Sequence, residues 1–342
     1  MSRSERRLQR IGSSMLISLP VDWIKTHTLK KGDVVSVETN NDNSISIFPT
    51  DTRREILKEV TILLPGLSTE KLLNQIYGSY LLGYDLIQIK GISPINYETR
   101  EQIKSVIRKL VGLEIVDEDS FKITIQFLLD SHSMEVSKIL KRMSSLIGGM
   151  HRDTISSLLK NNDTIGDLIR KRDDEVDRQY FLIVRLMRSA MMDRKLASSL
   201  NLTNIDLLDY RIAANHLESA GDHICSLASF LSSFQVDNHI AELIQNANLI
   251  IFKMHEQSVK GFIERNIDAS LQVIGLYSKF NEILKLISHE YVDRKIPSHK
   301  FVVSTINATS TMDKIARCWV DIADLVKPVY LMENPRNISN AR

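Results

Sequence analysis

The stretch LIRKRDDEVDRQYFLI, residues 168–183, has the apolar spacing of an amphipathic helix, and HLESAGDHICSLA, residues 216–228, has the same character. Each resembles a stretch further along the chain, VIGLYSKFNEILKLIS at 273–288 and TMDKIARCWVDIA at 311–323. The spacing between them corresponds to an internal repeat of about 100 residues. A helical repeat of this length predicts two antiparallel three-helix units.

Helical periodicity extends outward from these stretches over most of the C-terminal half of the chain. Polar breaks interrupt it at residues 161–163, 201–204, 236–238 and 296–298. The expected helices cover residues 133–160, 163–192, 205–233, 237–263, 268–293 and 297–328. We therefore expect an all-α domain over residues 132–330, with repeats at 132–234 and 237–330, and a disordered tail at 331–342.

Two pairs of carboxylates lie in the first of these repeats. Asp173 and Asp177 are four residues apart on one predicted helix, and Glu218 and Asp222 have the same spacing on another. Like charges at this spacing share a helix face and destabilise the helix unless a cation neutralises them. Four oxygen ligands on neighbouring helices suit a divalent or trivalent metal cluster of Fe, Mn, Mg or Zn. Gly221, unfavourable inside a helix, is expected where another group approaches closely.

Other interpretations of these residues stay open. Carboxylates on a helix are commonly solvated surface groups. His216 and His223 flank the second pair and are either ligands or titrating neighbours. The sequence has no HExxH, GxSxG or Walker motif and offers no candidate nucleophile. We therefore expect no enzymatic activity, and a dinuclear hydrolase is the weakest alternative.

The N-terminal third has a different pattern of apolar and turn-forming residues. Residues 1–52 carry short apolar alternations, such as Met15–Leu19 and Val34–Val37, separated by glycine and asparagine turns, which predicts short strands and hairpins. A few short strands cannot bury both faces of their sheet on their own. We therefore expect this domain to form a homodimer. Residues 55–129 alternate strand and helix patterns, which predicts a small β-α-β-α-β-β domain with its helices on one face.

Basic residues are concentrated at the start of the chain. Residues 1–31 hold seven lysines and arginines against two acidic residues, although the whole chain is nearly balanced, with 44 basic and 42 acidic side chains. A dimer doubles this local charge, which suits the phosphates of duplex DNA, but basic residues also protect strand edges from aggregation. The candidate DNA-binding residues are Arg6, Arg7, Arg10, Lys25, Lys30 and Lys31.

The cysteines and the apolar segments of the sequence indicate where in the cell the protein is expected. Cys225 and Cys318 form no CxxC pair, which is typical of reduced thiols in a cytosolic protein. The charged N-terminus has no apolar segment after it, and no apolar run is long enough to span a bilayer. We therefore expect a cytoplasmic protein without direct membrane insertion.

Two stretches resemble known families. RLQRIGSSMLISLP at residues 7–20, followed by WIK at 23–25 and LKKGDVV at 29–35, resembles the AbrB/SpoVT/MazE swapped-hairpin DNA-binding domain. The helical part resembles the PhoU family of phosphate-uptake regulators, whose repeats carry (Glu/Asp)-x-x-x-Asp motifs that bind metal clusters. DDEVD at 173–177 and ESAGDH at 218–223 match these motifs. The order of the three domains is similar to that of archaeal PhoU-like proteins.

The second repeat departs from the family pattern. Tyr277, Asn281, Asp313 and Arg317 stand where the family has acidic residues. The resemblance therefore implies one metal site, formed by Asp173, Asp177, Glu218 and Asp222. Asp313 and Arg317, four residues apart, are expected to pair with each other.

The resemblance implies an α+β multidomain, phosphate-responsive regulator. It would couple a metal-binding helical sensor to DNA binding and control phosphate uptake genes or a phosphate transporter. The implied partners are duplex DNA, a second copy of the chain and a phosphate ABC transporter ATPase. The alternative is a metal-binding scaffold or adaptor that inhibits a phosphate transporter without contacting DNA and uses its first domain only to dimerise.

Overall fold

The computed structural model describes most of the chain in two compact units, residues 1–56 and 57–342. The described residues are 5–39, 44–49, 57–64, 68–160, 165–231, 238–293 and 299–326. The tail expected at residues 331–342 lies outside them.

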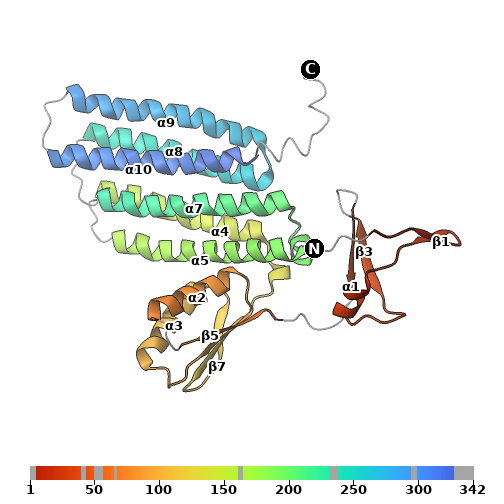
Figure 1. The fold of residues 1–342 in the computed structure, drawn as a ribbon. Coiled ribbons are helices and arrows are strands. Elements are labelled where there is room, and N and C mark those ends of the chain that lie inside the picture. Colours follow the sequence, from red (N-terminus) through yellow and green to blue (C-terminus); the bar gives the residue numbers. More distant parts are fainter. Residues whose placement is uncertain are drawn as a thin grey trace. The chain divides into compact units, whose positions relative to one another are not determined.

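The first unit consists of two antiparallel hairpins and one short helix (Figure 1). β1 (Gln9–Ile11) pairs with β2 (Ser14–Leu16) around Gly12, which adopts a positive φ of 60°. β3 (Val35–Thr39) pairs with β4 (Ile45–Pro49), and α1 (Val21–Thr26) begins directly after Pro20, as proline at a helix start predicts. The strand expected over Met15–Leu19 is shorter and ends at Leu16, because the chain turns toward α1.

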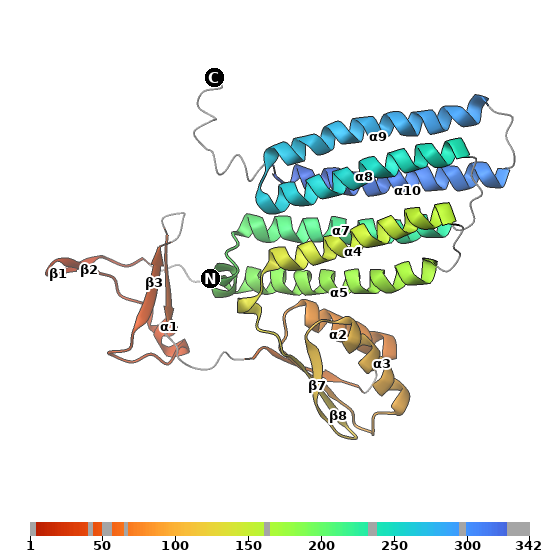
Figure 2. The same ribbon diagram turned by 180° about the vertical axis from the view of Figure 1, so that it is seen from behind.

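The second unit begins with a sheet covered by two helices. The strands are β5 (Glu59–Leu63), β6 (Leu86–Lys90), β7 (Leu113–Glu118) and β8 (Lys122–Phe127), in the order β5-β6-β8-β7. β5 and β6 are parallel and the other pairs are antiparallel. The helices α2 (Thr69–Leu81) and α3 (Tyr97–Lys109) lie on the same side of the sheet (Figure 2). Ser68 and Asn96 cap them by accepting hydrogen bonds from backbone N–H groups.

Six long helices follow in two layers of three (Figures 1 and 2). Their bounds are α4 (Val136–Lys160), α5 (Ile165–Met192), α7 (Asn204–Leu231), α8 (Asn238–Glu264), α9 (Ile267–Asp293) and α10 (His299–Asp324). Each lies within a few residues of its predicted range. α7 packs against α10 and α4 against α8, which joins the layers. The described part of the chain contains no helix with the length and hydropathy of a membrane span.

A short helix and one turn were absent from the sequence prediction. α6 (Arg194–Ser199) lies between α5 and α7, and its start is capped by Asp193, which accepts a hydrogen bond from the Lys195 backbone. The turn η1 (Ser131–Ser133) precedes α4. Elements of this length are too short to show a helical period, so only the capping aspartate could have indicated α6.

Arg185 on α5 joins the sheet layer to the helices. Its side chain is 2% exposed, and Nη1 donates to the carbonyl oxygens of Tyr80 at 2.9 Å and Tyr84 at 2.8 Å. Nη2 donates to Asp85 Oδ1 at 3.0 Å, and the guanidinium lies 3.8 Å from the centre of the Phe127 ring. The sheet and helices, predicted as separate domains, therefore pack as one compact unit.

Replacing Arg185 tests this junction. We expect Arg185→Ala to lower the free energy of unfolding by about 3–5 kcal/mol, because it leaves one buried carbonyl, one partly buried carbonyl and a carboxylate without their donor. Urea unfolding followed by circular dichroism measures the change. Arg188→Ala, on the exposed side of the same helix, is the matched control and should stay within about 0.5 kcal/mol. Equal effects of the two substitutions would contradict this role.

Two buried histidines lie where the helical layers meet. His151 Nε2 on α4 is 2.8 Å from Asn248 Oδ1 on α8, and His255 Nε2 on α8 is 2.8 Å from Ser144 Oγ on α4. The His255 ring also stacks on Trp319 of α10, with centroids 4.2 Å apart. Burial lowers the pKa of His151 to about 4 and that of His255 to about 3. Both rings are therefore neutral near pH 7.

These histidines predict a loss of stability in acid. The unfolded chain binds protons below about pH 6.5, whereas the folded chain does not until about pH 4, so protons favour unfolding over that window. We expect each histidine to lower the free energy of unfolding by up to about 1.4 kcal/mol per pH unit there. Urea unfolding at several pH values measures the slope. His151→Gln should reduce it, whereas His289→Gln, which changes an exposed side chain, should not.

Candidate functional site

The two predicted carboxylate pairs come together on neighbouring helices. Asp173 and Asp177 lie on α5, Glu218 and Asp222 lie on α7, and these two helices pack against each other. A Cβ atom at residue 221 would lie 3.0 Å from Asp173 Oδ1. Gly221 therefore gives the Asp173 carboxylate room beside α7, which confirms that a group approaches this glycine closely. We call Asp173, Asp177, Glu218 and Asp222 the acidic cluster.

The members of the acidic cluster repel one another. Burial raises the pKa of Asp173 to about 6, and the charges of Asp177 and Asp222 add to this shift. Burial and Asp222 also raise the pKa of Asp177 and of Glu218. Charging all four carboxylates in this half-buried place is therefore unfavourable without a compensating cation.

Cys225 and the two flanking histidines behave differently. The Cys225 thiol donates a hydrogen bond to Asp173, and burial together with the Asp173 charge raises the pKa of that thiol. Cys225 and Cys318 are free cysteines, as predicted. His216 Nδ1 lies 3.6 Å from Asp321 Oδ2 on α10, so its nearest carboxylate is outside the acidic cluster. Burial and the charge of Lys314 lower the pKa of His223.

The acidic cluster has the donor atoms of a metal site but not the geometry of one. Across the described ranges, no three His, Cys, Asp or Glu side chains have the arrangement of a metal site. Four carboxylates nevertheless form the oxygen donor set that hard cations prefer, and carboxylates can bridge two ions. Rotation of the side chains toward one another is needed for them to share an ion.

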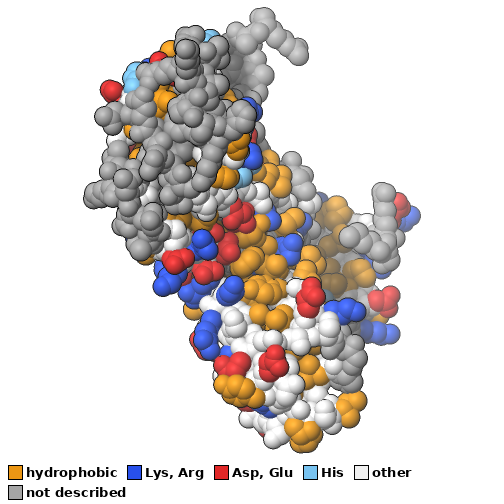
Figure 3. All heavy atoms as spheres, turned by 90° about the vertical axis from the view of Figure 1, so that its left-hand side faces the viewer, with side chains coloured by type: hydrophobic (Ala, Val, Ile, Leu, Met, Phe, Trp, Pro, Cys, Tyr) orange, Lys and Arg blue, Asp and Glu red, His pale blue; other side chains and the backbone are white. Residues whose placement is uncertain are grey.

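The α/β layer borders the acidic cluster, which the sequence did not indicate. Lys109 at the end of α3 places Nζ 3.9 Å from Asp174 Oδ1, and its charge lowers the pKa of Asp177 against the opposing effects. Burial raises the pKa of Tyr77 on α2, and the charges of Asp177 and Asp174 add to this shift. Acidic and basic side chains also lie beside one another on the face in Figure 3. Basic residues in the last turn of a helix are common, so Lys109 carried no specific signal.

The residues of the second repeat that correspond to the acidic cluster pair with one another. Asp313 Oδ1 accepts a hydrogen bond from the Tyr277 hydroxyl at 2.9 Å, and Asp313 Oδ2 accepts one from Arg317 Nε at 2.8 Å. The predicted pairing of Asp313 with Arg317 is confirmed. Both oxygens of this carboxylate are therefore already engaged.

The predicted DNA-binding side chains are accessible. Arg6, Arg7, Arg10, Lys25, Lys30 and Lys31 are all exposed in the first unit. Arg10 lies on β1, where its Nε donates to the Gly12 carbonyl at 3.2 Å, and Lys25 lies on α1. These positions leave their charges available to a ligand on the surface of this unit.

The first unit also lacks a core of its own. No side chain described within it is buried, and Ile11, Val37 and Ile45 are each about 60% exposed. Exposed apolar side chains on isolated two-stranded hairpins are typical of a sheet that another surface completes.

The helical part is similar to PhoU proteins. Residues 140–231 match the PhoU domain family, and all four members of the acidic cluster lie inside this range. The chain is 26% identical over 174 residues to a phosphate-specific transport system accessory protein PhoU homolog of Clostridium acetobutylicum, covering 48% of this chain and 78% of the relative.

A solved structure supports the fold of the helices. PhoU of Pseudomonas aeruginosa superposes with a TM-score of 0.50 at 18% identity, covering 58% of this chain and 96% of that protein. The phosphate transport system regulatory protein PhoU of Streptococcus pneumoniae gives 0.47 at 13% identity, with 58% and 93% covered. The C-terminal part is therefore a PhoU-like helical bundle.

Proposed function

We propose that this chain is a phosphate-responsive regulator in which a metal-binding helical unit controls DNA binding by the N-terminal unit. One observation carries the proposal. The range that matches the PhoU domain contains two carboxylate pairs on adjoining helices, where burial and neighbouring carboxylates raise the pKa values of Asp173, Asp177 and Glu218. Such a cluster is stable near pH 7 when a cation neutralises it.

The proposed metal ligands are Asp173, Asp177, Glu218 and Asp222. Their hard oxygen donors suit Mg, Mn, Fe or Zn ions, which supply positive charge between α5 and α7 when bound. We assign the site to the first repeat alone, because Asp313 in the second repeat is occupied by Tyr277 and Arg317. A fixed guanidinium there also repels a cation.

The proposed DNA-binding surface belongs to a homodimer of the first unit. A second copy would cover the exposed apolar residues of the hairpins, and two sets of the six exposed basic residues would follow the phosphates of a duplex. A change at the acidic cluster would then affect DNA binding through the chain that joins the two units.

A second function is favoured by the C. acetobutylicum relative, whose name gives it an accessory role in phosphate-specific transport. In this alternative, the chain is a metal-binding adaptor that inhibits a phosphate transporter through its ABC ATPase. Its first unit dimerises without contacting DNA. Binding to duplex DNA separates the two functions.

Metal removal tests the acidic cluster. We expect a chelator to lower the melting temperature of the natural chain, because a ligand that binds only the folded state stabilises it by RT ln(1 + [L]/Kd). Asp177→Asn combined with Asp222→Asn should remove both the bound metal, measured by elemental analysis, and the response to chelator. Asp313→Asn is the matched control and should retain both. Equal metal loss in the control would place the metal elsewhere.

Substitution of two arginines tests DNA binding. Arg7→Ala with Arg10→Ala should abolish the gel shift of duplex DNA at moderate salt, and the natural chain should lose affinity steeply as salt rises. Lys253→Ala with Lys260→Ala, on exposed positions of α8, is the control and should bind as the natural chain does. Sedimentation should give a dimer for every variant. A dimer that binds no duplex would favour the adaptor function.

A further inference from the structure

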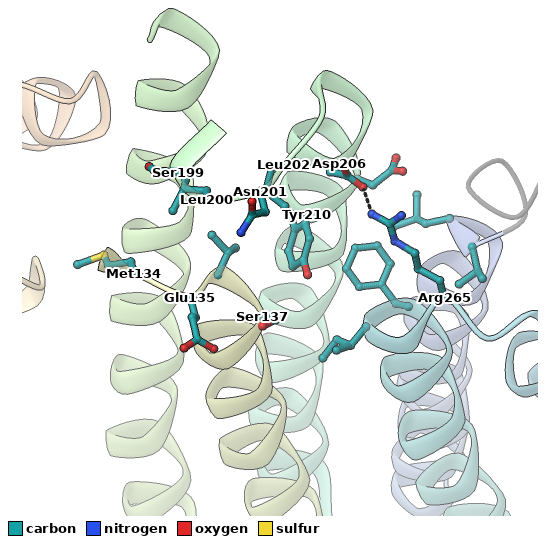
Figure 4. A pocket seen from close by; sticks show the side chains of 16 residues that line it. Met134, Glu135, Ser137, Ser199, Leu200, Asn201, Leu202, Asp206, Tyr210 and Arg265 are labelled. Carbon is teal, nitrogen blue, oxygen red and sulfur yellow. Dashed lines mark hydrogen bonds and ion pairs between the residues drawn. The ribbon is translucent and has the colours of Figure 1, made fainter. Parts of the chain in front are cut away.

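A cavity of about 440 Å³ lies at one end of the helical bundle (Figure 4). The residues that line it lie at the starts of α4 and α7, at the end of α6 and at the C-terminal ends of α8 and α10. This volume falls within the range of small-molecule sites in proteins. The acidic cluster contributes no residue to it.

Asp209 gives this cavity a chemical preference. The residue is 8% exposed, lines the cavity, and its Oδ2 atom has no hydrogen-bond partner among the described residues. Buried carboxylate oxygens are normally hydrogen-bonded, so this carboxylate lacks the protein partners that would offset its burial. Burial and the neighbouring Asp206 raise the pKa of Asp209.

The arginine in the lining of the cavity pairs with a different carboxylate. Asp206 Oδ2 accepts hydrogen bonds from the Thr203 backbone N–H at 2.8 Å and the Thr203 hydroxyl at 2.6 Å. These bonds cap the start of α7. Arg265 Nη2 donates to Asp206 Oδ1 at 3.0 Å, as the dashed line in Figure 4 shows. Asp206 is thus satisfied, and the charge of Asp209 is left for a ligand.

The rest of the lining favours an organic cation. Tyr210 and Phe262 pack edge to face with centroids 5.1 Å apart, and Leu202, Ile263 and Leu325 add apolar surface. Tyr210 lies between Asn201 and the Asp206–Arg265 pair in Figure 4. Aromatic rings beside a carboxylate are the surroundings in which an alkylammonium group binds. A phosphate ion would instead meet the Asp209 carboxylate and be repelled.

We propose that this cavity binds a small aliphatic amine, whose ammonium group pairs with the Asp209 carboxylate and whose carbon chain contacts the apolar lining. The unpartnered carboxylate costs stability in the free protein, because nothing offsets its desolvation. Such a cost is typical of binding sites that are retained for their ligand. Asp209→Asn is therefore expected to raise the melting temperature of the free protein while it weakens amine binding.

Cadaverine (1,5-diaminopentane) is the probe, and 1,5-pentanediol is its neutral control of matched length. Calorimetric titration of the full chain should show saturable binding of cadaverine and none of the diol. Asp209→Asn should weaken cadaverine binding at least tenfold. Glu282→Gln, at an exposed carboxylate on α9, should leave the binding unchanged. Ser137→Phe, which places a ring in the cavity, is the second variant and should also abolish binding.

A further arm separates this cavity from the acidic cluster. The Asp177→Asn, Asp222→Asn chain should still bind cadaverine, and loss of binding there would overturn the proposal. Unchanged binding by Asp209→Asn, or no saturable binding by the natural chain, would also overturn it. Inorganic phosphate should not bind the cavity. Phosphate binding that Arg265→Gln removes and Asp209→Asn retains would identify an anion site instead.

Discussion

The burial of one guanidinium underlies the arrangement of the second unit. Arg185 projects from α5 into the α/β layer, and burying this charge is tolerable because two carbonyls, a carboxylate and an aromatic ring surround it. Its carboxylate partner, Asp85, also accepts a hydrogen bond through Oδ2 from the Lys58 backbone at 3.0 Å. Lys58 lies next to the boundary with the first unit. Contacts therefore run without a break from α5 through Asp85 to the residue that precedes β5.

The same helix carries half of the acidic cluster. Asp177 precedes Arg185 by about two turns of α5, a separation of about 12 Å along a rigid element. A change in the spacing of α5 and α7, caused by neutralising the four carboxylates, would act on the Arg185 junction through this helix. In the second repeat, Tyr277 and Arg317 already satisfy the corresponding carboxylate, Asp313. The two repeats share a fold but differ in whether their carboxylates already have a neutralising partner.

Local patterns in the sequence predicted the helices and the acidic pairs, because both depend on spacing within one element. The six long helices follow from apolar periodicity and polar breaks, and the carboxylate pairs follow from their four-residue spacing. The roles of Arg185 and Lys109 depend on which elements meet in space, and nothing in their neighbouring residues distinguishes them from ordinary surface cations. The unpartnered oxygen of Asp209 is likewise visible only once Arg265, 56 positions later, is seen to pair with Asp206.

Helix α7 carries residues of both the acidic cluster and the cavity at Asp209. Asp209 lies near its start, and Glu218 follows about 14 Å further along the helix axis. The two places differ in what they can hold: the acidic cluster offers several oxygens to a small hard ion, whereas the cavity at Asp209 offers one oxygen beside aromatic surface. Since both sit on α7, a ligand that shifts this helix at one place changes the free energy of binding at the other. Thermodynamic linkage makes that effect reciprocal, so an amine in the cavity and a metal in the acidic cluster would each alter the affinity for the other by the same factor.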